Sequence, residues 1–399
     1  MNNERDILIG ALGPSLKRYE EQTAGMTLLG RPGPDGSVLD PIVQAIEHCP
    51  SYSRVAGKMI YSAHAGIVIH APRLAEDLFG RAQYKVLEAA DWLLRVLNTN
   101  TANGLFVAVI WGLELENEIR VSSTSRLIPF STLRKSTVKD RIEQRSRPNS
   151  HNAIWLTPTY YDKPGVALIT EVRELPYISA EGSPFTLLES VTKGASEVWA
   201  ILQAISVGHP LAIGYWFEYD DLDLDISAWE NSLRWHLPEV VPSIQSATLI
   251  DANVVQDELQ QYAALPDDIR RDLLRSMDRF ILSQCRRQPT DRVLDLALAF
   301  EIAVSGERSS APISWKVSHR SAQLIGGPLE VRKSNRKIVA DLYALRSKAT
   351  HGSSLKDMGG NSGDGLPAAA EVYRTVLKSF LELGKKPDWD TLELEPFSR

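Results

Sequence analysis

The spacing of apolar residues along the chain changes character after residue 250. In the first part, β-branched and aromatic residues gather in short runs, which predict strands at 104–116, 165–174 and 211–219. Apolar residues at intervals of three or four predict helices at 73–97 and 185–205. This pattern indicates a mixed α/β domain over residues 1–250.

From about residue 255 the strand pattern disappears, and apolar residues recur only at helical spacing. Five helices are expected, at 266–287, 291–304, 312–325, 330–350 and 367–383. Short links join them, as is typical of a helical bundle. We therefore expect an α+β protein, with the mixed domain at 1–250 followed by an all-α bundle at 251–399.

Composition narrows the class of protein further. The chain has 399 residues, 43% of them apolar, which argues against a disordered chain. Two cysteines, Cys49 and Cys285, exclude a disulfide scaffold and fit a reducing compartment. We expect a cytoplasmic protein without membrane contact, because the start shows no secretory pattern and the longest apolar run, 105–113, is about half a membrane span.

The net charge of −6 argues on its own against a nucleic-acid partner, but the charge is unevenly distributed. Residues 1–250 carry 22 basic and 29 acidic residues, a balance of −7, whereas residues 251–399 carry 22 and 21, a balance of +1. The second part also holds a basic run over one expected helix. Its members are Arg332, Lys333, Arg336, Lys337, Arg346 and Lys348.

Arg346 and His351 form the most suggestive pair in this run. They close an amphipathic helix, and Gly352 follows as a helix stop. At 100° per residue, five residues separate the two side chains by about 140°, so they do not share a face of a continuous helix. They converge if the helix ends just before His351 or if two copies meet. The alternative is a solvated arginine and a polar helix end.

Three segments of the C-terminal part resemble a HEPN domain, closest to the ApeA-like HEPN family of bacterial anti-phage defence. The order and spacing of the segments carry the resemblance: DRVLDLALAFE at 291–301, SWKVSHRSAQLIGG at 314–327 and IVADLYALRSKATHG at 338–352. The resemblance covers roughly residues 260–385. HEPN ribonucleases carry Arg, four to six residues, then His near a helix end, which Arg346 and His351 match, with polar Ser347 directly after the arginine.

The resemblance implies a metal-independent RNA endonuclease without a cofactor, tRNA being one candidate substrate. Abortive infection and homodimerisation through the bundle are implied in the same way. His351 would accept the 2′-hydroxyl proton while Arg346 holds the phosphate. We expect the N-terminal domain to sense a phage-derived trigger or to restrain the nuclease. The alternative is a non-catalytic HEPN module that dimerises or binds nucleic acid or a partner protein.

Several further residues have two readings each. Glu301 lies in a helix that is apolar on every side, so its carboxylate needs a partner. Either Glu301 supports Arg346, as Ser347 would, or it forms an ion pair with Arg320 or another arginine. Five basic residues are candidates for RNA binding, and the alternative is that they form a solvated helix face. They are Arg332, Lys333, Arg336, Lys337 and Lys348.

Two other groups are assigned structural roles. An acidic run is expected to be a solvated loop rather than a cation site, because no Gly turn or His accompanies it; it comprises Glu218, Asp220, Asp221, Asp223 and Asp225. Five tryptophans are expected in the core rather than in a base-stacking surface: Trp155, Trp199, Trp216, Trp229 and Trp235. No metal site is expected.

Overall fold

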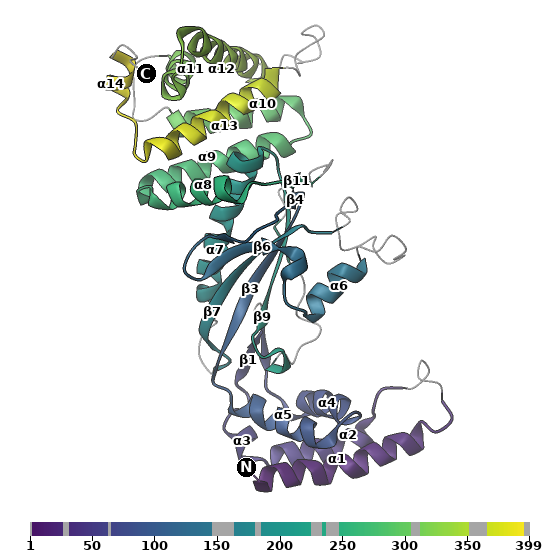
Figure 1. The fold of residues 1–399 in the computed structure, drawn as a ribbon. Coiled ribbons are helices and arrows are strands. Elements are labelled where there is room, and N and C mark those ends of the chain that lie inside the picture. The colour runs from purple at the N-terminus through teal and green to yellow at the C-terminus, as the bar shows by residue number, and fades with distance from the viewer. Residues whose placement is uncertain are drawn as a thin grey trace. The chain divides into compact units, whose positions relative to one another are not determined.

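The structure is a computed structural model of the whole chain (Figure 1). It describes residues 2–26, 32–62, 65–145, 163–179, 185–224, 234–236, 247–304, 312–350 and 365–394. The chain forms two compact units. Unit 1 comprises Met1–Val107, Thr170–Ser190 and Trp216–Leu233, and unit 2 comprises Ala108–Ile169, Val191–Tyr215 and Arg234–Arg399.

This division runs differently from the expected boundary at residue 250, because three long strands each contribute residues to both units. These are β3 (Thr101–Trp111), β7 (Val166–Pro176) and β9 (Ala212–Tyr219), close to the three predicted strands. They are three neighbouring strands of a six-stranded sheet of order β10-β9-β3-β7-β6-β5. Its other strands are β5 (Ile119–Arg120), β6 (Ser125–Pro129) and β10 (Arg234–His236).

Unit 1 gathers the first helices beside a small three-stranded sheet, β2-β1-β8. The helices are α1 (Asn2–Gln22), α2 (Gly36–Glu47), α3 (Pro50–Ser53), α4 (Ala71–Ala82) and α5 (Val86–Asn98), and the strands are β1 (Met59–Ser62), β2 (Ala65–Val68) and β8 (Ile178–Ser179). The single helix expected at 73–97 is two helices. Lys85 is extended, at φ −155° and ψ 99°, and separates them, although the apolar spacing continues on both sides.

Unit 2 begins with short strands and two helices outside the bundle. β4 (Leu113–Glu114) pairs in parallel with β11 (Thr248–Leu249), and α6 (Thr137–Arg145) follows η2 (Phe130–Thr132). The helix expected at 185–205 is α7 (Phe185–Ile201), which begins in unit 1, enters unit 2 at Val191 and continues as a π-helix, η4 (Leu202–Val207). Gly208, at φ 76°, ends it in the left-handed conformation that favours glycine.

The rest of unit 2 is helical, which confirms the α+β class. Its helices are α8 (Ala252–Ala264), α9 (Asp267–Cys285), α10 (Pro289–Val304), α11 (Ile313–Ile325), α12 (Leu329–Thr350), α13 (Gly365–Leu383) and α14 (Trp389–Leu394). α9 to α13 match the five predicted helices within about two residues at each end. Gly326 and Gly327 have positive φ and Pro328 follows, so α11 and α12 form a helical hairpin.

Aromatic rings form the centre of the bundle. Tyr373 of α13 stacks on Phe280 of α9 at 4.8 Å between centroids and meets Phe300 of α10 edge-on at 5.2 Å. The Tyr373 hydroxyl lies 2.5 Å from Ser276 Oγ, which donates to the Ala299 carbonyl. These contacts join α9, α10 and α13 and satisfy the buried phenol.

Truncating Phe300 tests this core. Phe300→Ala should lower the free energy of unfolding of the bundle by about 3–5 kcal/mol, because the ring is fully buried. Urea denaturation followed by circular dichroism measures the loss. Leu294→Ala on the same helix is the control, since Leu294 is 36% exposed, and it should change stability by about 0.5 kcal/mol or less. Equal losses for both variants would contradict this packing.

Candidate functional site

Helices α10 and α12 pack together in unit 2 and bring Glu301, Tyr343 and Arg346 into one cluster. The Tyr343 hydroxyl donates to Glu301 Oε1 at 3.1 Å, and Arg346 Nη1 lies 3.2 Å from the same oxygen. The exposed fraction rises outward, from 5% for Tyr343 to 18% for the Glu301 side chain and 36% for that of Arg346. The cluster therefore runs from the core to the surface.

Helical spacing explains why these residues meet. Tyr343 and Arg346 are three residues apart on α12 and share a face. The Arg346 guanidinium carbon lies 5.6 Å from the Tyr343 ring centroid, a cation–π distance. Burial, with the Glu301 carboxylate as the next cause, raises the pKa of Tyr343 far above its ordinary value. The phenol therefore stays a hydrogen-bond donor to Glu301 at neutral pH.

Of the two partners expected for Glu301, the structure selects Arg346. Arg320 instead donates through Nε to Glu393 of α14 at 2.6 Å, and its guanidinium lies over the Trp389 ring. A role of Glu301 in orienting Arg346 requires that the two side chains be in contact, as they are. Its part in catalysis stays a prediction.

His351 lies outside the described residues, so its position relative to Arg346 stays a prediction too. α12 is described as far as Thr350, whose hydroxyl donates to the Arg346 carbonyl at 2.8 Å. Ser347 and Lys348 are exposed on the same last turns. The described helix therefore extends to the residue directly before His351.

The basic run divides between two sides of α12. Arg332 is half-buried and donates to Gln323 Oε1 of α11 at 2.9 Å. Lys333 pairs with Glu330 at 2.9 Å and Lys337 with Asp341 at 2.6 Å, both on the same helix. Two exposed cations, Arg336 and Lys348, make no hydrogen bond or ion pair within the described part of the chain. They are the members best placed to meet an external anion.

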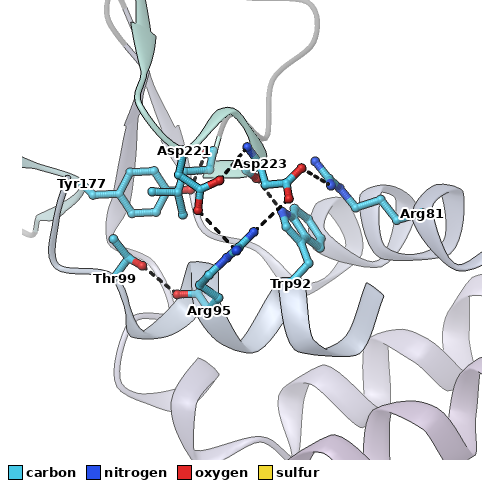
Figure 2. A network of polar contacts seen from close by, with 8 residues as sticks. Arg81, Trp92, Arg95, Thr99, Tyr177, Asp221 and Asp223 are labelled. Atoms are coloured by element: carbon cyan, nitrogen blue, oxygen red, sulfur yellow. Dashed lines mark hydrogen bonds and ion pairs between the residues drawn. The ribbon is translucent and has the colours of Figure 1, made fainter. Parts of the chain in front are cut away.

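The acidic run lies in unit 1, and Figure 2 shows the contacts of its centre. After β9, the short helix η5 (Leu222–Leu224) places Asp223 3.0 Å from Arg95 and 3.3 Å from Arg81. Trp92 Nε1 donates to the Asp223 carbonyl at 2.6 Å. Asp221 also pairs with Arg95, at 3.4 Å. These two carboxylates are ion-paired rather than simply solvated.

The other acidic residues differ in their surroundings. Glu218 is buried and accepts from Trp216 Nε1 at 2.9 Å, whereas Asp220 is exposed and Asp225 lies outside the described residues. The pKa of Asp223 is lowered, since the hydrogen bonds from Arg95 and Arg81 outweigh its partial burial. Over the described ranges, no group of three His, Cys, Asp or Glu side chains is arranged to hold a metal ion.

The arginines of Figure 2 line a surface cavity of about 570 Å³ in unit 1. Basic and acidic side chains alternate around it in equal number: Arg81, Lys85 and Arg95 against Glu88, Asp91 and Asp223. Trp92 lies beneath Arg81, whose guanidinium carbon is 4.2 Å from the indole centroid. The cavity offers a balanced polar lining rather than a cationic one.

The structure describes the side chains of two of the five tryptophans expected in the core. Trp199 and Trp216 are fully buried, as predicted. Trp155, Trp229 and the side chain of Trp235 lie outside the described residues. Trp315, which was not among the residues predicted to be functional, is 42% exposed and stacks on His319 at 4.7 Å. Its signal in the sequence is the four-residue spacing of Trp and His.

The chain matches no family model, and comparison with curated proteins and with solved structures finds no match. None of the helices that the structure describes is long and apolar enough to cross a membrane. Assignment of a function therefore depends on the residues of the site and on the HEPN resemblance of the sequence.

The buried phenol at the site gives a pH prediction. The unfolded chain releases the Tyr343 proton above about pH 10, whereas the folded chain retains it because its pKa is raised. The free energy of unfolding should therefore fall as the pH rises past 10. Tyr343→Phe should reduce that slope by up to about 1.4 kcal/mol per pH unit in urea denaturation. The exposed control Tyr84→Phe should keep it, and an unchanged slope for Tyr343→Phe would contradict the burial.

Proposed function

We propose that the chain is a metal-independent RNA endonuclease whose active site is formed by Arg346 and His351. The observation that carries the proposal is the cluster of Glu301, Tyr343 and Arg346, which holds a half-exposed guanidinium at the end of α12, five residues before His351. A positioned guanidinium is the group that phosphate chemistry requires.

The remaining donors of Arg346 are suited to a phosphate. A guanidinium has five N–H donors, and the contact with Glu301 engages Nη1. The outer donors can bind two phosphate oxygens and offset the charge that develops in the transition state. Holding Arg346 at both Glu301 and Tyr343 lowers the conformational entropy that substrate binding would otherwise cost.

The proposed reaction is attack of the RNA 2′-hydroxyl on the adjacent phosphorus. His351 accepts the hydroxyl proton, as an imidazole does near neutral pH. A bond forms from the 2′ oxygen to phosphorus, and the bond to the 5′ oxygen breaks. The 5′ oxygen takes up a proton, which leaves a cyclic phosphate and a 5′-hydroxyl end. DNA lacks the nucleophile and is not cut.

The wider role follows from the HEPN resemblance. In this proposal the bundle forms a homodimer in the cytoplasm, and the chain cleaves cellular RNA, with tRNA as the candidate substrate, during abortive infection. The N-terminal part senses a phage-derived trigger or restrains the nuclease. The polar cavity of unit 1, beside Arg81 and Arg95, gives a small ligand a place to bind there.

A non-catalytic HEPN module is the second candidate. The observation that favours this candidate is the half-buried ion pair between Arg346 and Glu301, because such a pair can also have a purely structural role. In that case the bundle binds RNA or a partner protein without cutting. RNA binding without cleavage products distinguishes this candidate from the nuclease.

Substitution of the two proposed catalytic residues tests the nuclease. Arg346→Ala and His351→Ala should each lower RNA cleavage by the full chain at least about 100-fold, because each removes a group that acts in the transition state. Cleavage of labelled tRNA in EDTA, analysed on denaturing gels, measures the effect. Wild-type chain should keep full activity in EDTA.

Arg275→Ala is the matched control, because its side chain is 67% exposed on α9 and pairs with Asp272 of its own helix. It should cleave at the wild-type rate. Circular dichroism and sedimentation should show that all variants fold and assemble as the wild type does. Undiminished cleavage by either the Arg346 or the His351 variant would refute the assignment.

A further inference from the structure

Between Trp315 and Gln323, helix α11 exposes a single stripe of side chains. The stripe consists of Trp315, His319 and Gln323, spaced four residues apart, so they lie one above the other. The six residues between Trp315 and Gln323 other than His319 are buried: Lys316, Val317, Ser318, Arg320, Ser321 and Ala322. This stripe is the face that α11 presents to solvent.

Trp315 stacks on a neighbouring ring although it is exposed. Its ring and the His319 imidazole are nearly parallel, at an interplanar angle of 16° and a centroid distance of 4.7 Å. Trp315 keeps 42% of its surface exposed. A tryptophan that is both exposed and fixed by stacking is suited to binding another flat ring. A single exposed apolar residue is common in proteins, so the exposure of Trp315 alone does not indicate a binding site. The charged residues near it decide whether it does.

Cations of α12 border the stripe. Arg332 donates to Gln323, the last member of the stripe, and Arg336 lies one turn further along α12. Burial lowers the pKa of His319, whereas the charge of Glu393 raises it. The charges of Arg336, Arg320 and Arg332 lower it further. These arginines therefore lie close enough to the imidazole to act on it. Arg336 is exposed and makes no ion pair with any described residue.

We propose that Trp315, His319, Arg332 and Arg336 form a binding surface for single-stranded RNA, the α11–α12 platform. An unpaired base stacks on the Trp315 ring, and Arg336 and Arg332 contact the flanking phosphates. A duplex is not accommodated in this way, since its bases are stacked on one another. The inference rests on the proposed nuclease and adds the form of RNA that it takes, unpaired rather than helical.

The platform is separate from the proposed chemistry. Arg336 and Arg346 are ten residues apart on one helix, about 15 Å along its axis. A phosphate at Arg336 is therefore remote from the phosphate at Arg346. The platform should contribute to RNA affinity and leave the rate of the chemical step unchanged.

Binding of a single strand that cannot be cleaved tests the platform. The probe is a fluorescein-labelled 12-nucleotide RNA with 2′-O-methyl groups, followed by fluorescence anisotropy with the full chain. Trp315→Ala should weaken binding at least about 5-fold, and Trp315→Phe should restore affinity to within about 2-fold, because phenylalanine keeps a stacking ring. Arg336→Ala should weaken binding and make it less sensitive to salt. Tyr84→Ala, which removes an exposed aromatic ring of unit 1, should leave the affinity unchanged.

Four outcomes would overturn the platform. They are absence of wild-type binding, equal affinity of Trp315→Ala and wild type, equal affinity of wild type for the strand and its duplex, and loss of dimerisation in Trp315→Ala with RNA affinity retained. The last would assign the surface to a second copy of the chain. Because the probe cannot be cleaved, absence of tRNA cleavage by the wild-type chain refutes the proposed function and not the platform.

Discussion

The carboxylate of Glu301 needs a partner, because its side chain is only 18% exposed and a largely buried charge is costly without one. Arg346 and the Tyr343 hydroxyl satisfy the same oxygen, which joins α10 to the last turns of α12. Together with the buried side chains of Val339 and Leu342, this contact fixes the rotation of α12 about its axis. It thereby determines which of the basic side chains face the core and which face solvent.

The rotation of α12 gives the two ends of the helix different roles. At its end, Arg346 is drawn inward and positioned, while its outer donors stay accessible. At its beginning, Arg332 is drawn toward α11, and Arg336 faces solvent near His319. Internal pairing partly neutralises the charges of Lys333 and Lys337, so the helix is less cationic than its sequence suggests. A local cationic surface on a chain of net charge −6 is compatible with RNA as a partner.

Sequence periodicity predicted most of the bundle, since five helices with apolar stripes and Gly or Pro stops need little beyond local information. It missed α8, whose apolar residues are sparse, although Asp251 caps it by accepting from the amides of Asn253 and Val254. It also joined α4 and α5, because the apolar spacing continues past Lys85. The division into units could not be predicted, since it depends on how β3, β7 and β9 pair.

The site was predicted in part. The need of Glu301 for a partner follows from its helix, but the choice between Arg320 and Arg346 depends on which helices face each other. The exposed position of Trp315 was missed because exposure is a tertiary property. The most direct test of the account is the single-turnover rate of RNA cleavage by Glu301→Gln, compared with Asp295→Asn on the same helix, whose carboxylate pairs with Arg279 and Arg286 instead. The account predicts a rate at least about tenfold lower for Glu301→Gln alone, because a misplaced guanidinium loses its hold on the phosphate; wild-type cleavage by that variant would contradict it.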